Sequence, residues 1–81
     1  MNNSFQTLQA LIDNKIIDID NYYSVNFRKW SVNLQGDYNS KLIQHLSREY
    51  GATFTIEGGF VVGSMAYQDE NGGVEIKFTF T

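Results

Sequence analysis

The amino-acid sequence predicts an α+β fold, in which an antiparallel sheet of four to five strands carries two helices on one face. Two segments place apolar residues at helical spacing, and most of the chain after residue 21 alternates apolar with polar residues. Glycine pairs interrupt this alternation at 58–59 and 72–73, where hairpins would turn. We therefore expect a single domain over residues 1–81 with the element order α-β-β-α-β-β-β.

The composition limits the classes of function. With 42% hydrophobic and 15% aromatic residues, the 81-residue chain has enough apolar material for one core. It has no cysteine, which excludes disulfides, thiolate metal sites and thiol nucleophiles. No signal-peptide pattern and no apolar run of about 20 residues is visible, so we expect a cytoplasmic protein with no membrane insertion. A net charge of −3 opposes general affinity for nucleic acids and anionic membranes.

The first helix is predicted over residues 5–14. Ser4 can serve as its N-cap, and Phe5, Leu8 and Leu11 follow at helical spacing. Asn14 suits the left-handed conformation that ends many helices. Residues 17–20 then alternate like a short extended connector.

A second helix is predicted after the turn cluster 36–40, whose last residue, Ser40, is a good cap. Gly51 ends this helix. Its apolar stripe consists of Leu42, Ile43, Leu46 and Tyr50. Its outer side carries Lys41, His45 and Arg48.

The segment 22–35 admits two arrangements. One apolar set with period two consists of Tyr23, Val25 and Phe27, and a second set with the opposite parity consists of Trp30, Val32 and Leu34. A two-residue turn at Arg28-Lys29 would pair residue 27 with 30 and bring both sets onto one face. The alternative is one long bulged strand, because Arg-Lys is poor chemistry for a tight hairpin turn. We prefer the hairpin.

Three more strands are predicted at 52–57, 60–68 and 74–81. A two-residue turn at Gly58-Gly59 pairs residue 56 with 61, and the acidic loop 69–73 pairs 67 with 76. Both turns place the same apolar set on the inner face of the sheet, and this agreement supports the register. The set consists of Phe54, Ile56, Val61, Met65, Tyr67, Val74, Ile76, Phe78 and Phe80. Gly63, opposite residue 54, is explained by close packing across the strands.

The same register leaves large apolar residues on the outer face of the sheet. Phe60 and Val62 point away from the helices, and adjacent apolar residues on an open face are typical of an interface. The strand 74–81 is also expected to be an unprotected edge that can pair with a second chain. The predicted protein interface consists of Phe60, Val62, Ser64, Lys77 and Thr79. Its expected partner is another protein or a second copy of the chain, which would form a homodimer.

No catalytic, cofactor or metal site is predicted. His45 is the sole histidine, and no Ser-His-Asp or Cys-His arrangement can be assigned to it. Asp18 and Asp20 could share one side of an extended segment, but the glycine and glutamate of a calcium loop are missing. The glycines form no dinucleotide-binding or phosphate-binding motif. A non-enzymatic role is therefore expected.

A nucleic-acid-binding module is the alternative function. The middle of the chain is locally basic, and Tyr22 and Trp30 accompany the basic residues, as aromatic residues do in single-strand binders. The candidate contacts are Arg28, Lys29, Lys41 and Arg48. Because nine acidic residues outnumber six basic ones, protein binding remains the preferred prediction.

In its size, acidity, lack of cysteine and asparagine-rich character, the chain resembles small accessory proteins encoded by bacteriophages and mobile elements, including inhibitors of host defence. The resemblance is one of general style over the whole chain, with no motif matched residue by residue. It implies a small protein that acts by binding to a host protein.

Overall fold

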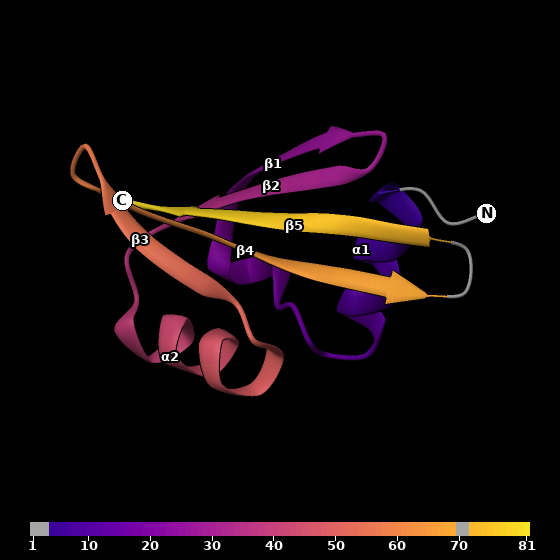
Figure 1. Ribbon diagram of the computed structural model, residues 1–81, viewed down its shortest axis with the longest axis horizontal. Helices are drawn as coiled ribbons and strands as arrows, with labels where there is room; N and C mark the ends of the chain where they lie inside the picture. The colour runs from indigo at the N-terminus through magenta and orange to yellow at the C-terminus, as the bar shows by residue number, and fades with distance from the viewer. Residues whose placement is uncertain (1–3, 70–71) are drawn as a thin grey trace.

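Both helices pack on the same face of one five-stranded sheet (Figure 1). The computed structural model describes residues 4–69 and 72–81. The elements are α1 (Ser4–Asp13), η1 (Ile19–Asn21), β1 (Tyr22–Arg28), β2 (Ser31–Gly36), α2 (Ser40–Tyr50), β3 (Thr53–Glu57), β4 (Phe60–Asp69) and β5 (Gly72–Phe80). The predicted α+β class, with five strands and two helices, is confirmed.

The sheet is mixed, so the prediction of an antiparallel sheet is wrong. The strand order is β1-β2-β5-β4-β3, and β2 and β5 run parallel while all other neighbours run antiparallel. The element order also differs from the prediction, because the 3₁₀ helix η1 lies between α1 and β1. A parallel pair needs a long crossover, and the segment containing α2, β3 and β4 provides it.

β5 is the central strand, which corrects the expectation that residues 74–81 form an unprotected edge. It lies between β2 and β4, and the edges of the sheet are β1 and β3. The physical reason is burial, because every second side chain of β5 is almost fully enclosed. These side chains are Val74, Ile76, Phe78 and Phe80.

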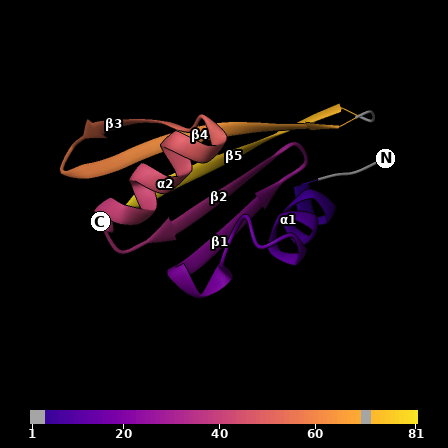
Figure 2. The ribbon, with the colours of Figure 1, turned by 90° about the horizontal axis from the view of Figure 1, so that it is seen from below.

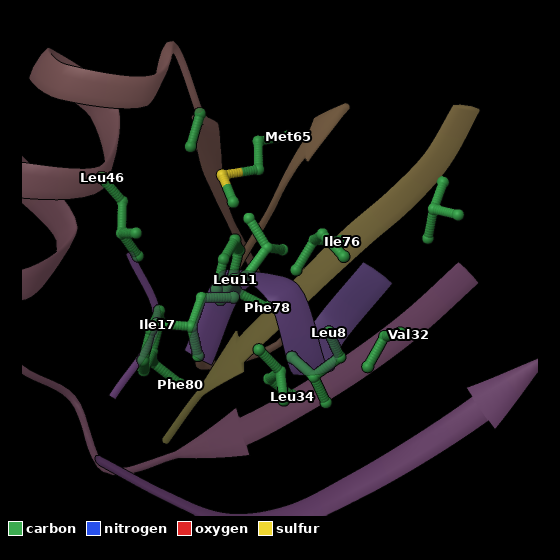
Figure 3. Close-up of a cluster of buried hydrophobic side chains, with 12 residues drawn as sticks. Leu8, Leu11, Ile17, Val32, Leu34, Leu46, Met65, Ile76, Phe78 and Phe80 are labelled. Atoms are coloured by element: carbon green, nitrogen blue, oxygen red, sulfur yellow. The ribbon is translucent and has the colours of Figure 1, made fainter. Parts of the chain in front are cut away.

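The core lies between this row of side chains and the two helices (Figures 2 and 3). α1 contributes Leu8 and Leu11, and α2 contributes Leu46. Val32 and Leu34 of β2 continue the row across the parallel pairing with β5. The connector after α1 adds Ile17, which is also buried.

The start and the end of α1 differ from the prediction in their details. The Ser4 hydroxyl donates to the carbonyl of Arg28, and the Ser4 N–H donates to the carbonyl of Lys29 at 3.1 Å. Ser4 therefore ties the helix to the β1–β2 turn, and it lies inside the helix instead of capping it. After the helix, Lys15 adopts the left-handed conformation (φ 60°) expected of Asn14.

The predicted extended connector is partly helical. Residues 19–21 form η1, and the carboxylate of Asp18 caps it by accepting the N–H of Asp20 at 3.0 Å. An aspartate side chain that bonds to the backbone two residues on favours a turn over a strand.

The hairpin arrangement of residues 22–35 is confirmed over the single bulged strand. Its turn is Lys29-Trp30, so Phe27 faces Val32 and the predicted pairing of residue 27 with 30 is wrong by two residues. Trp30 is consequently a turn residue, 40% exposed, and not part of the buried face. Neither turn residue has a positive φ. The carbonyl of Trp30 accepts the N–H of Glu75 at 3.0 Å, so tertiary hydrogen bonds hold a turn that lacks glycine.

A bulge near the start of β1 exchanges the roles of two tyrosines. The register shifts between Tyr22 and Ser24, which turns Tyr22 inward against the rings of Phe78 and Phe80 (centroids at 6.1 Å). Tyr23, which was predicted on the inner face, is 61% exposed. Gly36 pairs with Tyr22, where a Cβ would lie 2.5 Å from the carbonyl oxygen of Asn21. The close approach at Gly36 permits this local irregularity.

α2 begins and ends with recognisable caps. The side chain of Asn39 accepts the N–H groups of Lys41 and Leu42 at 3.1 and 3.2 Å, so Asn39 is the N-cap in place of the predicted Ser40. Gly51 ends the helix in the left-handed region (φ 69°), as predicted.

The β3–β4 hairpin has the predicted register, with Ile56 facing Val61 across Gly58-Gly59. Both glycines have positive φ, as the tight turn requires. Ile56 shares the inner face but is 79% exposed. It lies two residues before the Gly58-Gly59 turn, and the tip of this β3–β4 hairpin extends beyond α2 (Figure 1).

The β4–β5 pairing is shifted by two residues from the predicted one. Tyr67 faces Val74, and Met65 faces Ile76, because β5 already begins at Gly72. A shift by two leaves every side chain on its predicted face. Residues 70–71 of the predicted acidic loop lie outside the described residues.

Candidate interaction surface

The face of the sheet opposite the helices, here called the open face, has no helix over it in the described ranges (Figure 2). It is built from alternate residues of all five strands, because side chains of a strand point to opposite faces in turn. Across the sheet, the open face carries Asn26 and Arg28 of β1; Ser31, Asn33 and Gln35 of β2; Glu75, Lys77 and Thr79 of β5; Phe60, Val62, Ser64 and Ala66 of β4; and Thr53, Thr55 and Glu57 of β3.

The structure brings the five predicted interface residues together on this face. Val62 of β4 lies opposite Thr79 of β5, and Ser64 lies opposite Lys77. Phe60 stands at the hairpin end of the same row and is 45% exposed. The side chains form one continuous patch of two apolar groups, two hydroxyls and an ammonium group.

Two polar groups of the patch, the Thr79 hydroxyl and the Lys77 ammonium, make only weak interactions within the molecule. The Thr79 hydroxyl lies 3.5 Å from the Asn33 side-chain oxygen, a long hydrogen bond. The Lys77 ammonium lies 3.5 Å from the Glu75 carboxylate, and both side chains are about half exposed. An ion pair at such exposure contributes little to stability, because water screens it. These groups can therefore exchange their contacts for those of a partner at small cost.

The open face contains two shallow hollows. The central one is bordered by residues of β2, β3, β4 and β5, among them Asn33, Thr55, Val62 and Thr79. The second lies toward the β1–β2 turn, where Arg28 and Lys77 border it with Asn26, Ser31 and Asn33. Sequence reasoning missed the contributions of Asn33, Thr53 and Thr55, since these depend on the order of strands across the sheet.

Gly63 fixes how closely β3 and β4 approach beneath the patch. It lies opposite Phe54, and a Cβ there would overlap the Phe54 ring and the Thr53 carbonyl oxygen. The ring instead crosses the glycine and packs 6.0 Å from the ring of Phe78. This is the close packing predicted for Gly63.

Comparisons with other proteins gave no match. No family model, no curated protein and no solved structure is similar to the chain. In the part of the chain that the structure describes, no helix is long and apolar enough to cross a membrane. Function must be inferred from the chain's own surface.

The four basic residues of the nucleic-acid alternative do not come together. Arg28 borders the open face, and Lys29 lies in the β1–β2 turn with its ammonium 5.5 Å from the Trp30 ring. Lys41 and Arg48 are on α2, which packs on the opposite face of the sheet and lies far from that turn (Figure 1). One strand of nucleic acid would have to pass around the molecule to reach all four.

The remaining candidate groups have local structural contacts. The His45 ring packs edge-on against Tyr50 at 5.6 Å, and both are exposed on α2. Asp18 caps η1, as described above. Among residues 4–69 and 72–81, no three or more histidine or acidic side chains lie close enough to hold a metal ion. Each buried side-chain nitrogen or oxygen in the same ranges has a hydrogen-bond partner.

Proposed function

We propose that the chain is a small non-catalytic protein-binding module that uses the open face of its sheet. The observation that carries the proposal is the placement of Phe60 and Val62 on a face that neither helix covers. Exposed apolar groups that stand together, rimmed by polar ones, are typical of surfaces that bind proteins.

The chemistry of the open face indicates the kind of partner. Phe60 offers an aromatic anchor at one end, while threonine, serine and asparagine side chains offer hydrogen bonds over the rest. The charges of Lys77 and Glu75 partly cancel each other. Such a face suits a partner surface with a pocket for an aromatic ring and with few charges. The resemblance to phage accessory proteins supports a more specific form of the proposal, in which the partner is a host defence protein that the module inhibits.

The nucleic-acid alternative is less well supported. Its four basic residues are divided between two faces, and the chain has a net charge of −3. Because the basic residues do not form one continuous surface, we expect the chain to bind nucleic acid no more tightly than the non-specific range, with dissociation constants of about 10⁻⁴–10⁻⁶ M at physiological salt.

The proposal is tested by affinity capture from a native lysate with three forms of the protein. These are the wild type, Phe60→Asp on the open face, and His45→Ala on α2 as the control. We expect a discrete protein that the wild type and His45→Ala retain equally and that Phe60→Asp loses, because a carboxylate buried in the interface would lack a partner.

Two outcomes would contradict the proposal. The first is a partner held by Phe60→Asp as firmly as by the wild type but lost by His45→Ala, which would move the binding surface to α2. The second is nucleic acid as the retained species, recognised by the absorbance ratio of the eluate and released by salt.

A further inference from the structure

The outer edge of β3 is a free strand edge. β3 pairs with β4 on one side, and no described residue pairs with its other side. In the two-residue Gly58-Gly59 hairpin, Glu57 and Phe60 form the hydrogen-bonded pair beside the turn. The backbone N–H and C=O groups of residues 53, 55 and 57 therefore point toward β4. Those of Phe54 and Ile56 point outward, away from the sheet.

The opposite edge, β1, carries features that discourage pairing with another chain. It has a bulge between Tyr22 and Ser24, and it ends at the basic residue Arg28, which Lys29 follows in the turn. Bulges and basic side chains are common means of protecting an edge. β3 has no bulge, proline or basic residue, and its sequence Thr-Phe-Thr-Ile-Glu is rich in residues that favour strands.

β3 carries an exposed apolar side chain, Ile56, and also borders a hollow that could receive such a side chain from another strand. Ile56 projects from the inner face with 79% of its surface exposed. Two residues earlier on the same face, Phe54 borders a shallow hollow between β3 and α2, whose other lining residues are Ile43, Gln44, Ser47 and Arg48. A neighbouring strand that runs antiparallel to β3 could place one apolar side chain beside Phe54 at this hollow.

We propose that two copies of the chain form a homodimer by antiparallel pairing of their β3 strands about Thr55. In this register Thr55 faces Thr55 of the second copy, and Phe54 faces Ile56. The outward backbone groups of Phe54 then meet those of Ile56, which gives four hydrogen bonds across the two-fold axis. Each exposed Ile56 lies at the hollow beside the other copy's Phe54.

The charges of β3 are compatible with pairing to the β3 strand of a second copy. Glu57 faces Thr53 of the second copy, so the two carboxylates are not directly opposed, as they would be if the strands were centred on residue 57. The pairing joins two five-stranded sheets into one of ten strands and leaves both open faces accessible. The proposal is therefore independent of the open face as a protein-binding surface.

Sedimentation velocity over a range of concentrations tests the dimer. Ile56→Lys should weaken dimerisation by about tenfold or more, since it places a charge at the centre of the contact, and should remain folded because Ile56 is exposed. The matched control is Tyr23→Lys, an exposed apolar residue on the other edge, which should change the dissociation constant by no more than about twofold.

Single cysteines test the register, because the chain has none of its own. At a non-hydrogen-bonded antiparallel pair the Cα atoms are about 4.5 Å apart, within the range of a disulfide. Thr55→Cys should therefore form a covalent dimer with oxidised glutathione. The control Thr53→Cys lies four residues out of register with its own copy, about 13 Å away, and should not.

Several results would overturn the proposal. A wild-type protein that stays monomeric at about 1 mM, where even a millimolar complex is half formed, has no such dimer. A dimer unaffected by Ile56→Lys, or lost with Tyr23→Lys, uses another surface. Equal cross-linking of Thr53→Cys and Thr55→Cys excludes the register. None of these results depends on capture through Phe60, so the two proposals fail separately.

Discussion

At the scale of single residues, the absence of a side chain at Gly63 decides how closely two strands pack. The Phe54 ring lies over this glycine, so any Cβ at position 63 must displace both the ring and the Thr53 carbonyl of the β3 backbone. We expect Gly63→Ala to lower the free energy of unfolding by about 1–3 kcal/mol, the usual cost of overpacking. Urea unfolding checks this, with Ser64→Ala on the open face as the control. Equal stability of the two variants would show that the ring and the β3 backbone can both make room for a methyl group.

Tyr22 should make the fold sensitive to alkali. Burial raises the pKa of its hydroxyl above the ordinary value of about 10, and the nearby Asp18 carboxylate adds to the shift. Because the folded state holds this proton more tightly, its contribution to stability is complete below about pH 10. It is lost as the pH rises toward the folded-state pKa, by at most about 1.4 kcal/mol per pH unit.

Unfolding free energies measured at several pH values from 9 upward test this expectation. Tyr22→Phe should flatten the dependence on pH, because the titrating hydroxyl is removed. Tyr23→Phe is the matched control, since Tyr23 is the exposed neighbour. If Tyr22→Phe loses stability with pH as steeply as the wild type, another group is responsible.

At the scale of elements, α2 depends on a cap that the sequence pattern placed one residue too late. Both Asn39 and Ser40 are good N-cap residues, and the structure assigns the role to Asn39. Asn39→Ala should therefore cost about 1 kcal/mol of unfolding free energy. Ser40→Ala should stay within about 0.5 kcal/mol of the wild type. A larger loss for Ser40→Ala than for Asn39→Ala in thermal or urea unfolding would reverse the assignment.

Local patterns predicted most of the elements correctly, because the turns carry their own chemistry. Gly58-Gly59 fixed the β3–β4 register, and Gly51 fixed the end of α2. The errors arose where tertiary contacts replace local signals. Lys29-Trp30 makes a turn without glycine because Ser4 and Glu75 bond to its carbonyls. Tyr22 turns inward because Gly36 faces it.

At the scale of the whole molecule, the order of strands could not be predicted from sequence. The pairing of β2 with β5 joins residues far apart in the sequence, such as Val32 and Ile76. No turn connects the two strands directly, so no local sequence signal indicates that they pair. The five interface candidates needed only the inward and outward alternation of β4 and β5, and they lie together as expected. Asn33 and Thr55 join them only through the sheet order, which is why they were missed.

The proposed function requires that Phe60 stand on a free face of the sheet while Val74, Ile76, Phe78 and Phe80 of β5 fill the core. The free energies of unfolding of Phe60→Asp and Ile76→Asp test it most directly. Phe60 is 45% exposed and Ile76 is fully buried. Phe60→Asp should fold and lose no more than about 1 kcal/mol, whereas Ile76→Asp, which buries an unpaired charge, should not fold. If Phe60→Asp unfolds the protein as Ile76→Asp does, Phe60 belongs to the core and the open face cannot present it to a partner.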